Sequence, residues 1–251
     1  MLGSVWRGAG AVALAVSVAA GTAGCTAGTE HALPAHRPSA GHTAVAQAPA
    51  AHSVVKVRGF ASSCGRRTEA TGFVYAPERI LLNAHTVAGV DRDLEVVLDD
   101  GRRFPAQVVA FDPESDAAVL RAPGLTARPL RPTRGRRTTA VVVGYRKGEA
   151  APAVLPARVR PDEPAESYDI YDRKRVSRRV HRFQGAFQGA TVTPGMSGAP
   201  LITSEDRAMG MVFAANMDRA DVGYALTAAQ IEAVAAAGEK ATTTVPHEPC
   251  S

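Results

Sequence analysis

The chain has 251 residues, of which 45% are hydrophobic and 21% are charged, a globular composition that excludes an intrinsically disordered protein. It has 23 glycines, 17 prolines and only 5% aromatic residues, and no amphipathic helical pattern persists until close to the C-terminus, which favours an all-β fold. The net charge of +5 comes partly from two basic runs, residues 128–137 and 173–182. Neither run contains interleaved aromatic residues, so we interpret both as surface loops and expect no nucleic-acid partner.

The N-terminal segment predicts export. Residues 1–8 carry one Arg and no acid, residues 9–20 form a short apolar run, and small residues precede Cys25. This pattern predicts a signal peptide over residues 1–25, and its apolar run is short for a transmembrane helix. Small residues before a Cys also resemble a bacterial lipobox, although Thr22 stands where Leu is usual. We therefore predict an extracytoplasmic protein attached to the membrane through lipidated Cys25, with free secretion as the alternative.

Residues 26–52 are rich in Ala, Pro, Thr, Gly and His and have almost no large apolar side chain. Such a segment cannot bury enough surface to offset its conformational entropy, so a disordered linker is predicted. Its histidines have no regular metal-ligand spacing and no surrounding core, and we expect no metal site. The folded domain is predicted to span residues 53–251.

Short strand-like runs recur through this domain. Gly, Pro or Asp marks most of the gaps between them, as expected for barrels built from short antiparallel strands. Near the C-terminus, Thr227 is a suitable N-cap for a helix over residues 228–237, with Gly238 as its stop signal. The strand-like runs cover residues 53–60, 71–75, 79–82, 94–98, 104–111, 117–120, 139–143, 153–159, 183–192, 199–202, 209–214 and 223–226.

Ser197 lies between two glycines, just before the apolar pair Leu201 and Ile202, so a tight turn that leads into a strand exposes its hydroxyl. A nucleophilic serine needs this exposure and also needs backbone N–H groups that face the developing oxyanion, which glycine permits because it has no Cβ. The N–H groups of Gly195 and Ser197 would form this oxyanion hole. Similar turns occur in β proteins without catalysis, so the interpretation depends on a base and an acid.

A serine nucleophile requires a base, and His85 is the better candidate. It follows the apolar run 80–82, so a buried strand presents it at a strand end, whereas His181 lies in the basic run 173–182. A buried structural histidine is the alternative for His85. A Ser and an Asp that lie in a known order along the chain favour a catalytic role for His85.

The third member must be an acid that orients the imidazole and stabilises its charged form. Asp116 directly precedes the apolar run 117–120, so the start of a buried strand can carry it into the interior. Asp112, beside Pro113 on the preceding turn, is the alternative. The order His, Asp, Ser along the chain is the chymotrypsin order, unlike that of subtilisin or the α/β-hydrolases.

Four ordered segments around these residues are similar to the motifs of HtrA-type trypsin-like serine proteases. The resemblance implies two six-stranded antiparallel β-barrels with the active site between them, and peptide-bond hydrolysis without a cofactor. The chain resembles the MarP-like branch, the acid-resistance periplasmic serine proteases, more closely still, because Cys64 precedes the first motif and Cys250 lies at the extreme end. The four segments are residues 70–74, 82–89, 112–120 and 195–201.

We therefore predict an exported serine endopeptidase that hydrolyses protein or peptide substrates through an acyl-enzyme intermediate, with His85, Asp116 and Ser197 as its triad. The alternative is a catalytically silent protease fold that acts as a binding module at the cell envelope, on cell-wall polymers through its basic loops. Reaction with a fluorophosphonate probe distinguishes the two hypotheses.

The cysteine count supports a further prediction. With Cys25 assigned to export, Cys64 and Cys250 remain as a single pair in an oxidising compartment, where an even count suggests a disulfide. We predict that they pair and tether the C-terminal tail to the first barrel.

Substrate specificity depends on the base of the primary pocket, which in chymotrypsin-type enzymes lies six residues before the nucleophile. Thr191 holds this position, and Phe213 and Ala214 are predicted to line the pocket walls. A pocket floor without a carboxylate cannot compensate the desolvated charge of Lys or Arg. We therefore predict cleavage after small or medium uncharged residues.

Overall fold

The computed structural model describes residues 49–135, 137–185, 192–247 and 250. The predicted signal peptide, Cys25 and most of the predicted linker lie outside these residues. Within them, no helix combines the length and the apolar character needed to cross a membrane. The described part begins with a 3-10 helix, η1 (Pro49–Ser53), in which Ala50 is 4% exposed. The described residues therefore include a short helix that begins before the predicted boundary at residue 53.

The first half of the domain is a seven-stranded antiparallel sheet in the order β5-β4-β1-β2-β3-β7-β6. β5 and β6 are separated only by Ala106, whose N–H donates to the Leu94 carbonyl at 2.9 Å. This segment pairs with β4 at its start and with β7 at its end, so the sheet curls into a half-barrel around an aliphatic core. Its strands are β1 (Val54–Ala61), β2 (Arg66–Ala76), β3 (Arg79–Leu82), β4 (Arg92–Val97), β5 (Arg103–Pro105), β6 (Gln107–Asp112) and β7 (Ala117–Arg121).

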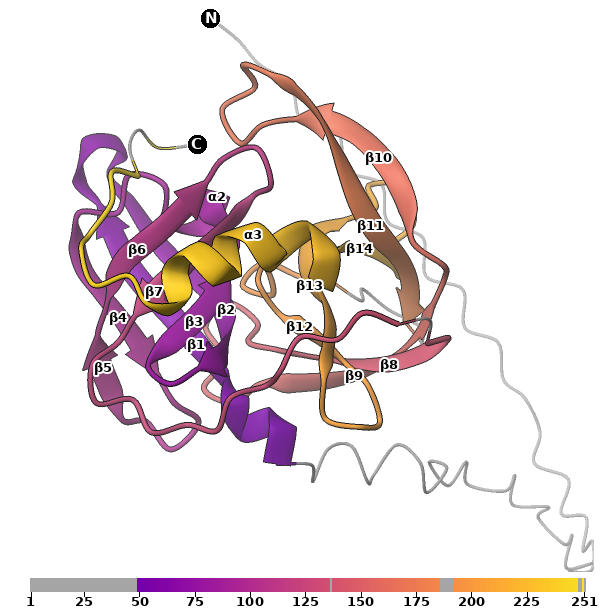
Figure 1. The fold of residues 1–251 in the computed structure, drawn as a ribbon, viewed down its shortest axis with the longest axis horizontal. Coiled ribbons are helices and arrows are strands. Elements are labelled where there is room, and N and C mark those ends of the chain that lie inside the picture. Colours follow the sequence, from indigo (N-terminus) through magenta and orange to yellow (C-terminus); the bar gives the residue numbers. More distant parts are fainter. Residues whose placement is uncertain (1–48, 136, 186–191, 248–249, 251) are drawn as a thin grey trace, which may run out of the picture. The chain divides into compact units, whose positions relative to one another are not determined.

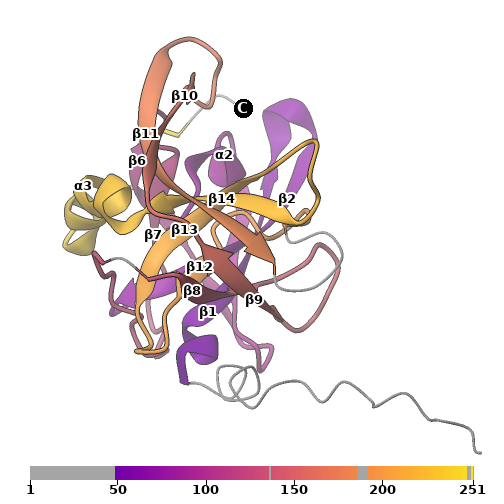
Figure 2. The ribbon, with the colours of Figure 1, turned by 90° about the vertical axis from the view of Figure 1, so that its right-hand side faces the viewer.

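The second half is a sheet in the order β10-β11-β14-β13-β12-β8-β9, and a further pairing of β11 with β9 closes a six-stranded barrel. β10 pairs only with β11 and lies outside the closed ring, where the two strands extend beyond the rest of the barrel (Figures 1 and 2). The strands are β8 (Thr139–Gly144), β9 (Ala153–Val159), β10 (Glu163–Tyr168), β11 (Arg175–Gly185), β12 (Pro200–Ile202), β13 (Ala208–Ala215) and β14 (Val222–Thr227).

The predicted all-β fold with two barrel units is confirmed, and most predicted strands overlap observed ones. The strand predicted over residues 183–192 is an exception, because β11 ends at Gly185 and residues 186–191 lie outside the described residues. The strand count differs from six and six because Ala106 interrupts one strand of the first sheet and β10 adds a strand to the second. β10 was not predicted because its residues are polar and nearly all exposed, so they show no alternation.

The prediction of a surface loop over residues 173–182 is wrong from Arg175 onward. These residues belong to β11, in which Val176, Arg178 and Val180 alternate as buried positions. β10 pairs with residues 175–180 and β14 with residues 180–184, and this main-chain pairing outweighs the basic composition that suggested a loop. His181 is likewise buried on this strand.

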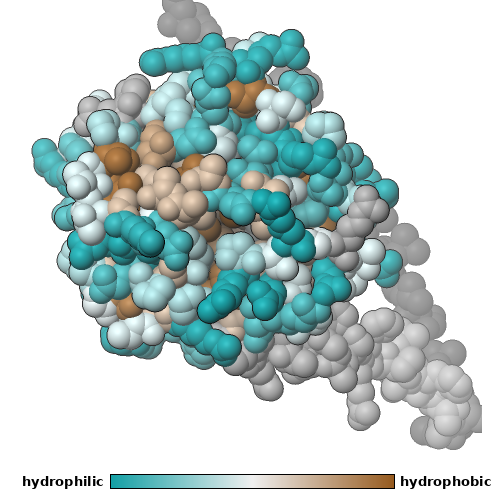
Figure 3. Space-filling view, viewed as in Figure 1, coloured by the Kyte–Doolittle hydropathy of each residue, from teal (hydrophilic) through white to brown (hydrophobic). Residues whose placement is uncertain are grey.

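The C-terminal helix α3 (Ala228–Glu239) begins at the predicted N-cap, where the Thr227 hydroxyl accepts from the Gln230 N–H at 3.1 Å. The predicted stop at Gly238 is wrong, because Gly238 is still helical and packs against the Val119 side chain. α3 contacts β6 and β7 of the first barrel and β11, β13 and β14 of the second, and so lies across both (Figure 1). On the face of the molecule that carries α3, hydrophilic residues surround an area in which hydrophobic and intermediate residues are mixed (Figure 3).

Candidate active site

Strand pairing brings His85 and Asp116 together. β3 pairs with β7 with Leu82 opposite Ala118, so the residues that follow β3 and those that precede β7 lie at the same end of the sheet. His85 is in the short helix α2 (Ala84–Val87), which begins directly after Asn83. Its Nδ1 lies 2.8 and 3.0 Å from the two carboxylate oxygens of Asp116, and its backbone N–H donates to Asp116 Oδ1 at 3.0 Å.

The carboxylate of this pair is buried and the imidazole reaches the surface. The Asp116 side chain is 6% exposed and the His85 side chain 32%. Asp116 has a φ of +53°, in the left-handed region, and its carbonyl accepts from the Asn83 side chain at 3.1 Å. A carboxylate on the Nδ1 side of an imidazole fixes the tautomer and the orientation of the ring, so that Nε2 is the nitrogen that exchanges a proton.

The alternative candidates have other contacts. Asp112 accepts hydrogen bonds from the Glu114 N–H and the Ser115 hydroxyl, so its carboxylate caps the turn that precedes Asp116. His181 has its Nδ1 3.4 Å from the Arg160 carbonyl, and burial lowers the pKa of its imidazole. The geometry favours His85 and Asp116 over these two residues.

Ser197 lies on a turn whose backbone requires glycine on both sides. Gly195 and Gly198 have φ values of +95° and +89°, which non-glycine residues rarely adopt. A Cβ on Gly198 would lie 2.0 Å from the Thr71 carbonyl oxygen, so the turn approaches β2 more closely than any side chain allows. The same Cβ position is 3.4 Å from the Cα of Leu82, which places the turn beside the strand end that leads into His85.

Thr71 connects this turn to the first barrel. Its N–H donates to the Ser197 carbonyl at 3.0 Å, and its hydroxyl donates to the Gly195 carbonyl and accepts from the Tyr145 N–H, both at 2.8 Å. The side chain is fully buried. The sequence motif contained Thr71 but gave it no role, because no local pattern reveals a contact with a segment so distant in the chain.

The N–H groups of Gly195 and Ser197 lie on the same turn. Within the described part of the chain, neither N–H donates to a protein acceptor, whereas the neighbouring N–H groups of Met196 and Gly198 are bonded to Thr193 and Val212 carbonyls. Two neighbouring unbonded donors beside a serine can bind an oxygen that carries negative charge.

Of the predicted pocket residues, Thr191 lies outside the described residues. Phe213 and Ala214 are half-buried on β13, next to a register irregularity between Val212 and Ala214. They directly follow Val212, whose carbonyl accepts from the Gly198 N–H at 2.8 Å. Both residues are therefore adjacent to the Ser197 turn.

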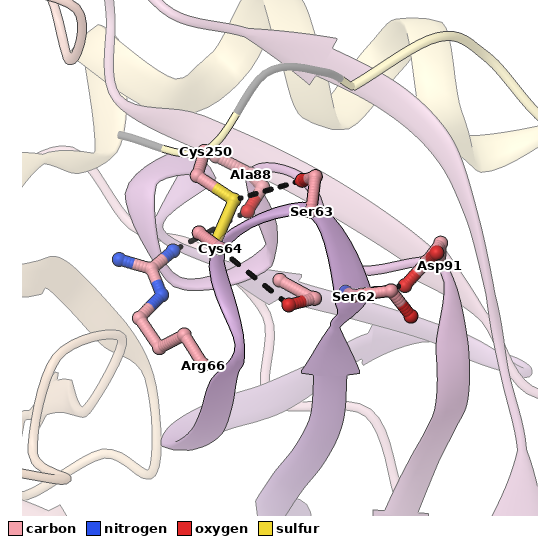
Figure 4. The surroundings of a disulfide bond; sticks show 8 residues. Ser62, Ser63, Cys64, Arg66, Ala88, Asp91 and Cys250 are labelled. Atoms are coloured by element: carbon pink, nitrogen blue, oxygen red, sulfur yellow. Dashed lines mark hydrogen bonds between the residues drawn. A yellow bond between two sulfur atoms is a disulfide. The ribbon is translucent and has the colours of Figure 1, made fainter.

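Cys64 and Cys250 form a disulfide in the structure, with Cα atoms 6.6 Å apart (Figure 4). Cys250 packs against Gly89, just past α2, and the Gly89 N–H donates to the His247 carbonyl at 2.7 Å. The C-terminal tail therefore lies against the loop that follows the helix carrying His85.

Comparisons with known proteins agree with this arrangement. Residues 70–211 match the family described as the trypsin-like peptidase domain. Serine protease Rv3671c of Mycobacterium tuberculosis (strain H37Rv) is 39% identical over 184 residues, which cover 71% of this chain and 44% of that protein. The chain thus spans less than half the length of this curated relative.

Two solved structures are similar in fold. The crystal structure of the Rv3671c protease from M. tuberculosis in its active form has a TM-score of 0.75 and 36% identity, covering 84% of this chain and 89% of that one. The HtrA-type protease AlgW with a bound tripeptide has a TM-score of 0.64 and 22% identity, covering 78% and 62%, respectively. At this identity the second likeness concerns the fold alone.

Proposed function

Because the chain belongs to the trypsin-like peptidase family, we propose that it is a serine endopeptidase with Ser197 as nucleophile, His85 as base and Asp116 as the orienting acid. The observation that carries the proposal is the hydrogen-bonded pair of His85 and buried Asp116 at the strand end beside the Ser197 turn. Protein or peptide substrates follow from this activity.

The proposed reaction begins when Ser197 Oγ attacks the scissile carbonyl carbon while His85 takes the hydroxyl proton. The N–H groups of Gly195 and Ser197 bind the oxyanion of the tetrahedral intermediate, and Asp116 stabilises the imidazolium. His85 then gives its proton to the leaving amine, which leaves an acyl-enzyme on Ser197. Water, deprotonated by His85, hydrolyses the ester and restores the serine.

The test is labelling of the purified protein with a fluorophosphonate probe, together with hydrolysis of casein. Wild-type protein should become labelled, and Ser197→Ala should remove labelling and lower turnover by about four orders of magnitude or more. Ser204→Ala is a matched control, because Ser204 lies outside the proposed site and should leave both readouts unchanged. A wild-type protein that neither labels nor cleaves casein would favour the silent binding module instead.

We also propose that the protein is exported and anchored through lipidated Cys25. The proposal rests on the charge, the short apolar run and the small residues of positions 1–25. Metabolic labelling with an alkyne fatty acid should modify the wild-type protein and not Cys25→Ser. An unlabelled wild-type protein in the culture medium would indicate free secretion.

For specificity, we propose cleavage after small or medium uncharged residues, on the basis of Thr191 and the apolar residues Phe213 and Ala214. The nearby acid Asp221, which directly precedes β14, already accepts hydrogen bonds from Gln184 and Arg219. A peptide-library cleavage profile tests the proposal, and dominant cleavage after Arg or Lys would contradict it.

A further inference from the structure

We propose that Arg178, a buried residue of the second barrel, is a positioning residue for Asp116: it holds the turn that carries this acid and keeps a positive charge beside it. The inference rests on the proposed function, because Asp116 is the orienting acid of the triad proposed above. It assigns a role to a residue that the sequence pattern placed in a surface loop.

Arg178 occupies an inward position on β11, between the buried Val176 and Val180, and is only 4% exposed. A charged side chain at such a position destabilises the fold unless its donors are bonded and its charge is balanced. Its neighbours on the same strand, Ser177 and Arg179, are exposed. The strand therefore directs one arginine inward and the next outward.

The guanidinium of Arg178 binds the turn before Asp116. Nε donates to the Glu114 carbonyl at 2.8 Å and Nη2 to the Pro113 carbonyl at 3.5 Å, while Nη1 donates to the Tyr168 carbonyl at 3.0 Å on its own hairpin. One planar group thus joins the β10–β11 hairpin of the second barrel to the turn of the first barrel.

Two further contacts strengthen the same junction. The Ile170 N–H donates to the Pro113 carbonyl at 3.2 Å, and Lys174 forms an ion pair with Glu114 at 2.7 Å. The turn needs this support because Asp116 has a left-handed backbone, which is unfavourable for a residue with a side chain. Releasing the turn would allow Asp116 to leave the position in which it faces His85.

The charge of Arg178 acts on the same acid. All three of its acceptors are main-chain carbonyls, and it forms no ion pair with a carboxylate among the described residues. Burial lowers the pKa of its guanidinium, and the charges of Asp116, Asp112 and Asp169 oppose this effect, with Asp116 contributing most. The arginine and the triad acid therefore stabilise each other in their charged forms.

This electrostatic role has a direction that an experiment can measure. The acids that face Arg178 are Asp116, Asp112 and Asp169, with the Lys174–Glu114 ion pair at the edge of the turn and His85 beyond Asp116. A positive charge here opposes protonation of both Asp116 and His85. Its removal should therefore allow the pair to become protonated at higher pH. Because the reaction needs ionised Asp116 and neutral His85, the acidic limb of the plot of kcat/KM against pH should also move to higher pH.

The test compares Arg178→Met, Arg178→Lys and the control Arg179→Met, whose arginine is exposed and pairs with Asp162. Histidine NMR titration in a Ser197→Ala background follows His85 without requiring activity. Arg178→Met should move the His85 titration to higher pH, because a positive charge near the pair is removed. Arg178→Lys, which keeps the charge, and Arg179→Met should not.

Kinetics on the same substitutions in active protein provide the second readout. Arg178→Met should lower kcat by about tenfold or more with little change in KM, because it disturbs orientation rather than substrate binding. Identical His85 midpoints in Arg178→Met and wild type would overturn the inference, as would an Arg178→Lys protein whose His85 midpoint moves as far as that of Arg178→Met. If wild type fails to react with the fluorophosphonate, the proposed function fails, and the NMR midpoints still decide whether Arg178 acts on the pair.

Discussion

The two halves of the proposed site are built in different ways. The half with His85 and Asp116 belongs to the first barrel and depends on side-chain hydrogen bonds at a strand end, with Asp116 in a strained backbone conformation. The half with Ser197 belongs to the second barrel and depends on main-chain geometry, with glycine on both sides of this serine. The first half contributes an ionisable carboxylate–imidazole pair, and the second contributes the backbone N–H groups of Gly195 and Ser197.

In spite of this difference, each half is held by a residue of the opposite barrel. Thr71 on β2 binds the carbonyls of Gly195 and Ser197, and Arg178 on β11 binds the carbonyls of Pro113 and Glu114. Neither barrel alone would therefore fix its own part of the site. A competent site therefore requires that the two barrels pack against each other, with α3 in contact with both.

The largest expected effect concerns the acid of the first half. Asp116→Asn keeps the size and the left-handed backbone that Asn tolerates, but the amide can no longer stabilise an imidazolium. We expect kcat to fall by about four orders of magnitude with little loss of stability. Steady-state kinetics and thermal unfolding check both parts.

Asp112→Asn is the matched control for this prediction. It changes the other acid of the same turn, whose carboxylate accepts hydrogen bonds from Glu114 and Ser115. We expect a much smaller loss of kcat. Equal losses in the two variants would show that the turn as a whole, and not the Asp116 charge, determines activity.

The second prediction concerns the disulfide, which lies on the side of the first half. The bond closes a loop with a sequence separation of 186, so the chain-entropy model gives a stabilisation of at most about 5 kcal/mol. Cys64→Ser with Cys250→Ser should lower the free energy of unfolding towards that limit. The kcat of the folded protein should persist, because the hydrogen bonds described between His85 and Asp116 do not involve the tail.

Urea unfolding with and without dithiothreitol measures this effect. The reductant should destabilise wild type and leave the double variant unchanged, which separates loss of the bond from the serine substitutions. Mass spectrometry that finds two free thiols in protein from the native compartment would refute the bond.

The comparison also shows what the sequence could predict. Strands with clear alternation or apolar runs, such as Val54–Ala61 and Ala117–Arg121, were located because local pattern determines them. The glycine-bounded Ser197 and the His85 and Asp116 candidates were also identified from local motifs. Thr71 and Arg178 acquire their roles only from contacts between barrels, and a basic run such as residues 173–182 gives no local indication that one of its arginines is buried.

The third prediction tests the second half through Thr71. Thr71→Val keeps the shape of the side chain but removes the hydrogen bond to the Gly195 carbonyl and leaves the Tyr145 N–H without its acceptor. We expect a loss of about 1–3 kcal/mol in stability, the range for an unsatisfied buried group. The kcat should fall by about tenfold to a hundredfold, because the N–H groups proposed to bind the oxyanion lose their alignment.

Two variants make this prediction specific. Thr71→Ser keeps the hydroxyl and should recover most of the activity. Thr203→Val removes another buried hydroxyl, which accepts from the Glu205 N–H, and should reduce stability without a change in kcat. Wild-type kcat in Thr71→Val would show that the glycines alone position the turn.

The smallest effect is expected at the loop between β8 and β9, which contacts the Ser197 turn of the second half. Lys56 is 3% exposed and lies 3.3 Å from the Glu69 carboxylate, which also accepts from the Gly148 N–H at 2.7 Å. Lys56 also donates to the Glu149 carbonyl. This loop reaches the Ser197 turn through the Lys147 N–H, which donates to the Pro194 carbonyl at 2.8 Å.

The pKa of Glu69 makes this support dependent on pH. Burial acts to raise the pKa, but the Gly148 N–H and the Lys56 charge outweigh it, so the pKa is lowered on folding. A group whose pKa is lowered on folding contributes stability above its unfolded pKa, which is about 4.3 for Glu, and loses that contribution as the pH falls through the folded value. Glu69→Gln should therefore lower the free energy of unfolding by about 1–2 kcal/mol at pH 7 and have progressively less effect below about pH 4. Urea unfolding across this range measures the difference, with the exposed Glu149→Gln as control, and a difference that is independent of pH would show that the carboxylate charge is not what holds the loop.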